Sequence, residues 1–114
     1  MLSIDKQKDI EHVTLILDGQ VDASNSVELD DEIKEVLSLN YKTILVDGSG
    51  LDYISSAGLG VFMSYLEDFE EKDIQFLIFG LSDKVANVFH ILGLDQLITL
   101  KANKEDALKT INEA

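Results

Sequence analysis

The stretch GLDYISSAGLGVF, residues 50–62, places two serines between an apolar run and an amphipathic segment. The apolar run TILV at 43–46 has the composition of a strand that is covered on both faces of a sheet. The segment 59–69 repeats its apolar residues at intervals of three and four, which is typical of a helix. The sequence therefore predicts a strand, a short loop that carries Ser55 and Ser56, and the start of a helix.

A serine loop of this kind has two uses that the local pattern leaves open. A serine before a helix is among the best N-terminal caps, and one serine is enough for that purpose. The backbone N–H groups at a helix start also lack partners within the helix, and the helix dipole is positive there. The same loop can therefore hold a phosphate without disturbing the fold.

The pattern on either side of this loop predicts an α/β domain. The expected strands are 2–7, 13–17, 43–46, 74–79 and 97–100, and the expected helices are 27–37, 59–69, 85–92 and 105–111. The order ββαβαβαβα, with buried central strands, predicts a single domain over residues 1–114. Its central sheet is expected to be mixed but mostly parallel, with about four or five strands and with helices packed against it.

The apolar stripes also assign individual side chains to the core. On the three longer helices the expected inward residues are Val27, Leu29, Ile33, Val36 and Leu37, then Leu59, Phe62, Met63, Leu66 and Phe69, then Val85, Val88, Phe89 and Leu92. Ser24, Asn25 and Ser26 are candidate caps of the first helix. His90 is expected to pack half-buried on a helix, and His12 to be solvated in a turn.

Composition limits the classes of function. The formal net charge is −13 with only nine Lys and Arg residues, which argues against binding to nucleic acid or to an anionic membrane surface. The acidity either keeps the protein in solution or suits a partner with a basic contact surface. The chain has no cysteine, two histidines far apart, a charged start and no long apolar run. We therefore expect a cytoplasmic protein with no disulfide, no metal site, no cofactor and no insertion into a membrane.

The sequence does not contain the motifs of the common catalytic and phosphate-binding sites that we compared with it. A nucleophile elbow needs Gly-x-Ser-x-Gly, but Ile54 occupies the first glycine position before Ser56. The chain has no Gly-x-x-x-x-Gly-Lys phosphate loop, and residues 18–20 (DGQ) do not supply the acid pair of a receiver domain. Acyl carriers are small and acidic too, but they are all-helical and carry Asp-Ser-Leu at their serine. We therefore expect a binding protein rather than an enzyme, with no catalytic residue.

Residues 52–61, DYISSAGLGV, resemble the signature of STAS domains, specifically that of the anti-sigma factor antagonists. Three further segments agree in the order of the family: GQVD at 19–22, ILVD at 44–47 and LGLDQL at 92–97. The resemblance covers essentially the whole chain and implies a STAS-like fold. It also implies a protein that binds a serine-kinase anti-sigma factor when unphosphorylated and is released when that kinase phosphorylates it, which regulates transcription. A PPM-type serine phosphatase would reverse the modification.

In that family the acceptor serine lies two residues before the glycine that opens the second helix, which makes it Ser56 here, with Ser55 as the alternate. Antagonists commonly have an acid before the acceptor and Ser or Thr after it, whereas this chain has Ser55 and Ala57. Which hydroxyl is modified therefore stays open. The resemblance implies a partner-binding face made of Asp22, Ser55, Ser56, Ala57, Gly58, Val61 and Tyr65.

The resemblance leaves open both the roles of single residues and the function of the whole domain. Asp22 can equally be a turn or capping residue, and Asp47 is expected to support the loop rather than to do chemistry. The whole domain can also be a STAS scaffold of a stress-signalling complex or a subunit of a phospholipid-transport complex, with no phosphorylation switch. In either case we expect a monomer or a weak dimer.

Overall fold

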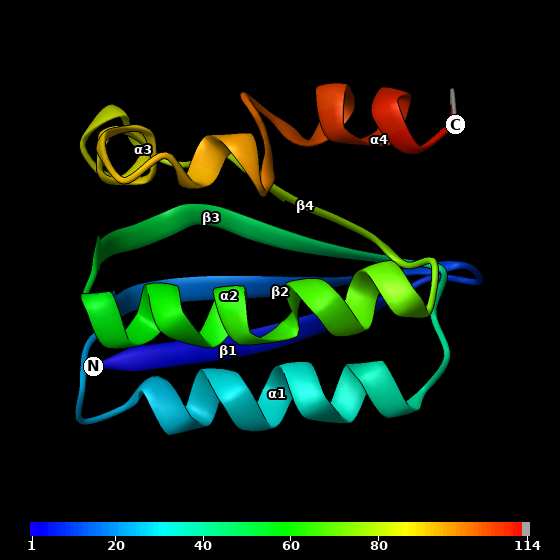
Figure 1. The fold of residues 1–114 in the computed structure, drawn as a ribbon, viewed down its shortest axis with the longest axis horizontal. Coiled ribbons are helices and arrows are strands. Elements are labelled where there is room, and N and C mark those ends of the chain that lie inside the picture. Colours follow the sequence, from blue (N-terminus) through cyan, green and yellow to red (C-terminus); the bar gives the residue numbers. More distant parts are fainter. Residues whose placement is uncertain (113–114) are drawn as a thin grey trace.

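Five strands form one sheet in chain order, β1-β2-β3-β4-β5, in the computed structural model, which describes residues 1–112 (Figure 1). The strands are β1 Leu2–Lys8, β2 His12–Val21, β3 Thr43–Ile54, β4 Gln75–Phe79 and β5 Thr99–Lys101. Strand β1 runs antiparallel to β2, and every other neighbouring pair is parallel. The predicted mixed, mostly parallel sheet is confirmed.

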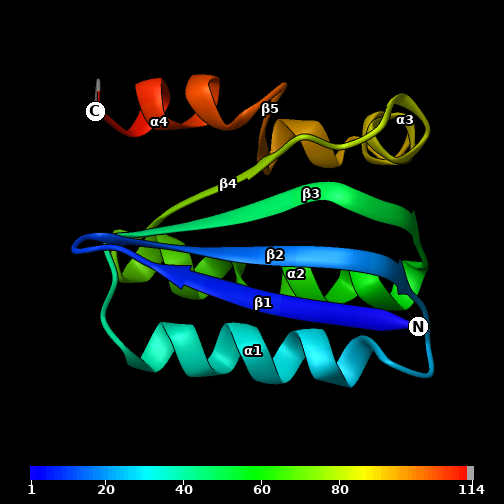
Figure 2. The same ribbon diagram turned by 180° about the vertical axis from the view of Figure 1, so that it is seen from behind.

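The helices cover the sheet from both sides. They are α1 Ser26–Ser38, α2 Ser56–Glu71, α3 Asp83–Ile91 and α4 Lys104–Asn112, and a short 3₁₀ turn, η1, spans Leu94–Gln96. Helices α1, α2 and α3 share one hydrophobic core with Ile44 and Val46. Helix α4 packs on the opposite face of the sheet, where its Ala107 forms a second apolar cluster with Leu45. Figure 2 shows the ribbon from behind. Side chains alternate between the faces of a strand, so the apolar run of β3 is buried on both, as its composition predicts.

Strand β3 is longer than expected, because residues assigned to the serine loop continue the strand. The carboxyl end of β2 is also extended, and it pairs Gln20 with Tyr53 and Val21 with Ile54. The register of this pair shifts twice, between Ile16 and Asp18 and between Gly19 and Gln20. Such irregularities interrupt the ladder locally and bend the strand, after which the pairing resumes. The loop between β3 and α2 therefore shrinks to Ser55 alone.

The core assignments of α1 and α2 are correct in part. Leu29, Ile33 and Val36 are buried, but Val27, at the second position of α1, is 60% exposed. On α2 the buried residues are Gly58, Leu59, Phe62, Tyr65 and Phe69. The inward stripe of α2 is therefore rotated from the expected one, and Met63, predicted to lie in the core, is 43% exposed.

Three expectations near the histidines are wrong. His90 is exposed rather than half-buried, and its Nδ1 lies 2.8 Å from Asp95 Oδ2, so this side chain links the end of α3 to η1. Leu92, predicted to lie in the core, is 58% exposed and is the C-cap residue of α3. His12 begins β2 and its side chain is 21% exposed, so it is not the solvated turn residue that we expected.

Candidate functional site

The two serines lie at the junction of β3 and α2 and have different environments. Ser55 is the N-cap of α2, with extended backbone angles (φ −86°, ψ 171°), and its hydroxyl oxygen accepts a hydrogen bond from the Gly58 N–H at 3.3 Å. Ser56 is the first residue of the helix and is exposed. Within residues 1–112 its hydroxyl makes no hydrogen bond. One serine therefore caps the helix, and its neighbour presents a free hydroxyl.

The backbone N–H groups at this junction are placed to bind an anion. The first intrahelical bond runs from Leu59 N–H to the Ser55 carbonyl at 3.0 Å, and Gly58 N–H is satisfied by the cap. The N–H groups of Ser56 and Ala57 precede both and have no partner within the helix. They point in the same direction as the positive end of the helix dipole. A phosphate on Ser56 would therefore lie where its own domain tolerates negative charge.

The loop between β2 and α1 lies beside this junction, because the Ser55 N–H donates to the Val21 carbonyl at 2.8 Å. Asp22 follows Val21 and organises its own turn. Its Oδ1 accepts from Ser24 Oγ at 2.6 Å and from the N–H groups of Ser24 at 2.9 Å and Asn25 at 3.2 Å. The hydrogen bonds from Ser24 lower the pKa of Asp22 below its ordinary value. The geometry of Asp22 is thus that of a turn residue with one carboxylate oxygen already engaged.

Gly58 belongs to the packing of α2 rather than to its surface. A Cβ at this position would lie 2.6 Å from Val21 Cγ1 and 2.8 Å from Ile54 Cγ1. The lack of a side chain lets the helix approach the ends of β2 and β3, which holds the serines in place. Ala57 and Val61 are half-buried beside it.

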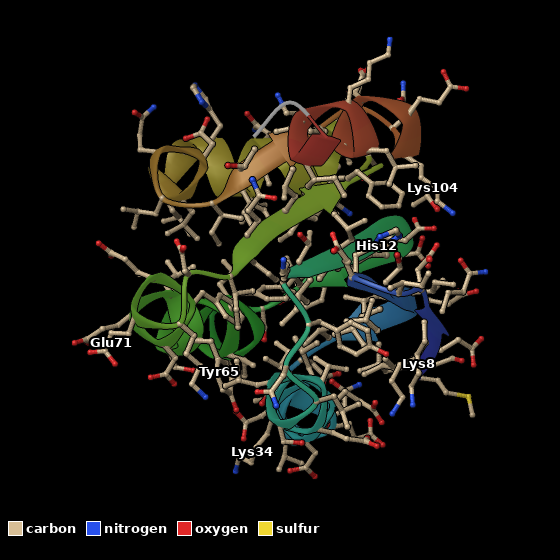
Figure 3. The ribbon with its side chains drawn as sticks, turned by 90° about the vertical axis from the view of Figure 1, so that its right-hand side faces the viewer. Lys8, His12, Lys34, Tyr65, Glu71 and Lys104 are labelled. Atoms are coloured by element: carbon tan, nitrogen blue, oxygen red, sulfur yellow. The ribbon has the colours of Figure 1, made fainter. Side chains whose placement is uncertain are left out.

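The prediction that Tyr65 lies on an exposed interface is wrong. This residue is 7% exposed, and its Oη donates to Asp30 Oδ1 at 2.7 Å, so it joins α2 to α1 (Figure 3). Burial and the neighbouring Asp30 raise the pKa of Tyr65 well above its ordinary value. A signal was present in the sequence, since Tyr65 lies three residues after Phe62 and four before Phe69, which is the spacing of an inward stripe.

Sequence reasoning missed exposed apolar residues around the serines. Met63 lies two helical turns after Ser56 on α2, and Gly60, between them, is also exposed, so these three residues share one face of the helix. Tyr53, two residues before Ser55, is 46% exposed. Val27 is exposed on the first turn of α1, which begins at the same end of the molecule as α2 (Figure 1). Aromatic and Met side chains on a surface are typical of protein interfaces.

Residues 1–112 contain neither a metal-binding cluster nor a membrane-spanning helix. No group of three or more His, Cys, Asp or Glu side chains is placed to hold a metal ion. None of the helices in this part of the chain has the length and apolarity needed to cross a bilayer.

Comparison with known proteins places the chain in a family. The model of the STAS domain matches residues 2–107. An anti-sigma-B factor antagonist of Listeria monocytogenes is 29% identical over 97 residues, which are 84% of this chain and 84% of the relative. A crystal structure of an anti-sigma factor antagonist from Mycobacterium paratuberculosis has a TM-score of 0.90 at 18% identity, over 98% of this chain and 95% of that one.

A further fold neighbour is the phosphorylated form of the Bacillus cell fate determinant SpoIIAA, with a TM-score of 0.72 at 19% identity, over 96% of this chain and 99% of that one. These structural likenesses agree with the sheet order and the helix arrangement described above. Since the family model spans nearly the whole chain and the fold agrees with it, this protein belongs to the STAS domain family.

Proposed function

We propose that this protein is an anti-sigma factor antagonist, a cytoplasmic binding protein without enzymatic activity. It binds an anti-sigma factor serine kinase when Ser56 is free and loses that binding when Ser56 is phosphorylated. The observation that carries the proposal is the free, exposed hydroxyl of Ser56 at the start of α2. The names of the relatives support the regulatory class, and one fold neighbour is itself a phosphorylated protein.

The environments of the two serines favour Ser56 as the acceptor. The Ser55 oxygen is engaged with Gly58 N–H, and a cap of this kind is worth about 0.5–2 kcal/mol. A kinase that used Ser55 would compete with the cap, whereas Ser56 can be modified with the cap in place. Ser55 is the alternate acceptor.

The switch follows from electrostatics at one end of the molecule. A phosphate adds about −1.5 to −2 charges. Its own helix dipole favours that charge by about 0.3–1 kcal/mol, so the domain stays folded. A partner that covers Ser56 must instead desolvate the phosphate without a matched cation, which costs several kcal/mol. Since about 1.4 kcal/mol changes affinity tenfold, one phosphate is enough to stop binding.

The proposed contact face centres on Ser56 and continues along α2 to Met63. Gly60 leaves room between them for a partner's backbone, and Tyr53 and Val27 supply apolar contacts at the margin. Asp22 shapes the adjacent turn. A PPM-type serine phosphatase would reach the same face to remove the phosphate.

Intact-mass analysis after incubation with an ATP-binding anti-sigma kinase from the same genome tests this proposal. We expect the mass of one phosphate on the natural chain and on Ser55→Ala, and no added mass on Ser56→Ala. Phosphate lost only in Ser55→Ala would move the switch to Ser55. A complete lack of phosphate on the natural chain would instead favour the alternative function, a STAS scaffold or transport-complex subunit that is never modified.

A further inference from the structure

Asn25 stands at the N-cap position of α1, but its side chain does not cap that helix. Its Oδ1 instead accepts from the backbone N–H of Asp22 at 2.9 Å, and its Nδ2 donates to the Gln20 carbonyl at 2.9 Å. An amide side chain carries both an acceptor and donors, so it can satisfy these two backbone groups at once. Asn25 therefore holds the two peptide groups that flank Val21, at the end of β2.

One of these two peptide groups, the one that joins Val21 to Asp22, also anchors the serine junction. Its N–H donates to Asn25, and its carbonyl accepts from the Ser55 N–H at 2.8 Å. Because a peptide group is planar, fixing its N–H also fixes the direction of its carbonyl. Hydrogen bonds joined through one peptide group also polarise one another. A line of bonds therefore runs from the Asn25 amide to the backbone of Ser55, directly before Ser56.

Val21 also joins the two segments through its side chain. It is fully buried, and it is the nearest neighbour that a Cβ on Gly58 would meet, at 2.6 Å. The hydrogen bonds that Asp22 Oδ1 accepts from Ser24 lie within the turn. Those of the Asn25 side chain reach back to the strand instead. Asn25 thus ties the loop between β2 and α1 to the residue on which the start of α2 rests.

We propose that Asn25 is a positioning residue for the modification of Ser56, a role that rests on the proposed function. It fixes the loop between β2 and α1 against the serine junction, so that a kinase meets both as one preorganised surface. Without the two bonds of Asn25 the loop is freer, and kinase binding must supply the cost of ordering it. The hydroxyl that reacts is unchanged, so the defect falls on KM rather than on kcat.

Asn25→Ser is the test variant, because serine caps a helix about as well as asparagine but is too short to bond both backbone groups. Amide hydrogen exchange, followed by NMR without any kinase, should be at least about threefold faster at the Ser55 N–H. The Leu77 amide, in the middle of β4, should keep its rate within roughly twofold. Asn103→Ser is the matched control, because Asn103 Oδ1 accepts from Asp106 N–H at 2.9 Å at the start of α4. This control should leave exchange at Ser55 unchanged.

Kinetics with an ATP-binding anti-sigma kinase from the same genome measure the effect on modification. Asn25→Ser should raise KM for the chain at least about threefold and leave kcat within roughly twofold. Asn25→Asp keeps an acceptor for the Asp22 N–H and loses only the donor to Gln20. Its exchange rate at Ser55 should therefore lie between those of the natural chain and Asn25→Ser.

Equal exchange at Ser55 in the natural chain and in Asn25→Ser would overturn the proposal. Equal acceleration at Ser55 and Leu77 would do the same, because Asn25 would then act on global stability alone. An unchanged KM in a variant with faster exchange would show that the kinase does not need the loop in place. A natural chain that accepts no phosphate would contradict the proposed function instead, and the exchange measurement would then decide by itself whether Asn25 holds the junction.

Discussion

Ser55 and Ser56 are neighbours in sequence but differ in role because the backbone changes from extended to helical between them. The hydroxyl oxygen of Ser55, in the extended conformation, accepts from Gly58 N–H, whereas Ser56, in the helix, is exposed. The role of Tyr65 likewise depends on where the fold places its ring and its hydroxyl. Its ring lies in the core, and its hydroxyl reaches the one carboxylate of α1 that is close enough to accept. The role of each of these side chains therefore depends on whether its hydroxyl already forms a hydrogen bond within the domain.

Replacement of Tyr65 by Phe tests that assignment. Loss of a hydrogen bond to a carboxylate should lower the free energy of unfolding by about 1.5–3 kcal/mol at neutral pH, measured by urea denaturation. Tyr53→Phe is the control, because Tyr53 is 46% exposed and should change stability little. Equal effects of the two substitutions would contradict the role given to the Asp30 contact.

The same residue predicts a pH dependence. The pKa of Tyr65 in the folded chain is raised above its ordinary value of 10.0, so the unfolded chain loses this proton first as pH rises. The unfolded state then binds fewer protons than the folded state, and stability falls as pH rises above about 10. Tyr65→Phe should show a shallower fall than the natural chain. Identical slopes would mean that Tyr65 ionises as freely in the folded state as in the unfolded one.

Two glycines of α2, Gly58 and Gly60, have opposite environments next to the serines. Gly58 allows the first turn to approach Val21 and Ile54, and Gly60, on the outer face, has nothing within 4 Å of a Cβ. The extended pairing of β2 with β3 brings those strand ends to the helix. The contacts of α2 with the ends of β2 and β3 therefore determine the position of Ser56.

The two glycines give a matched pair of substitutions. Gly58→Ala should destabilise the domain by about 1–3 kcal/mol, since its methyl group overlaps Val21 and Ile54. Gly60→Ala should instead raise stability by up to about 1 kcal/mol, because Ala is the better helix former and meets no neighbour. Thermal denaturation of both variants measures the difference. A stable Gly58→Ala would show that α2 can shift without harm.

The whole molecule is an acidic domain with its proposed binding surface at the start of α2. The serine end combines a free hydroxyl with exposed apolar residues. The sheet of five strands supplies the base against which the start of α2 is held.

A charge at position 56 should act on binding and not on folding. Ser56→Asp should keep the melting temperature within a few degrees, because an acid at a helix start is favoured by the dipole. It should weaken binding of the proposed kinase partner at least about tenfold, measured by calorimetry. Ser56→Asn is the control of similar size without the charge. A variant that unfolds would show that position 56 is structural.

The order of the elements, the doubly buried run at 43–46 and the serines at a helix start followed from sequence alone, because periodicity and turn chemistry are local properties. The tertiary structure decided the rest. It lengthened β3 through pairing with β2, and it turned Tyr65 inward to Asp30 and Met63 outward. These outcomes depend on which strand and helix lie next to each residue, and such neighbours are distant in the chain.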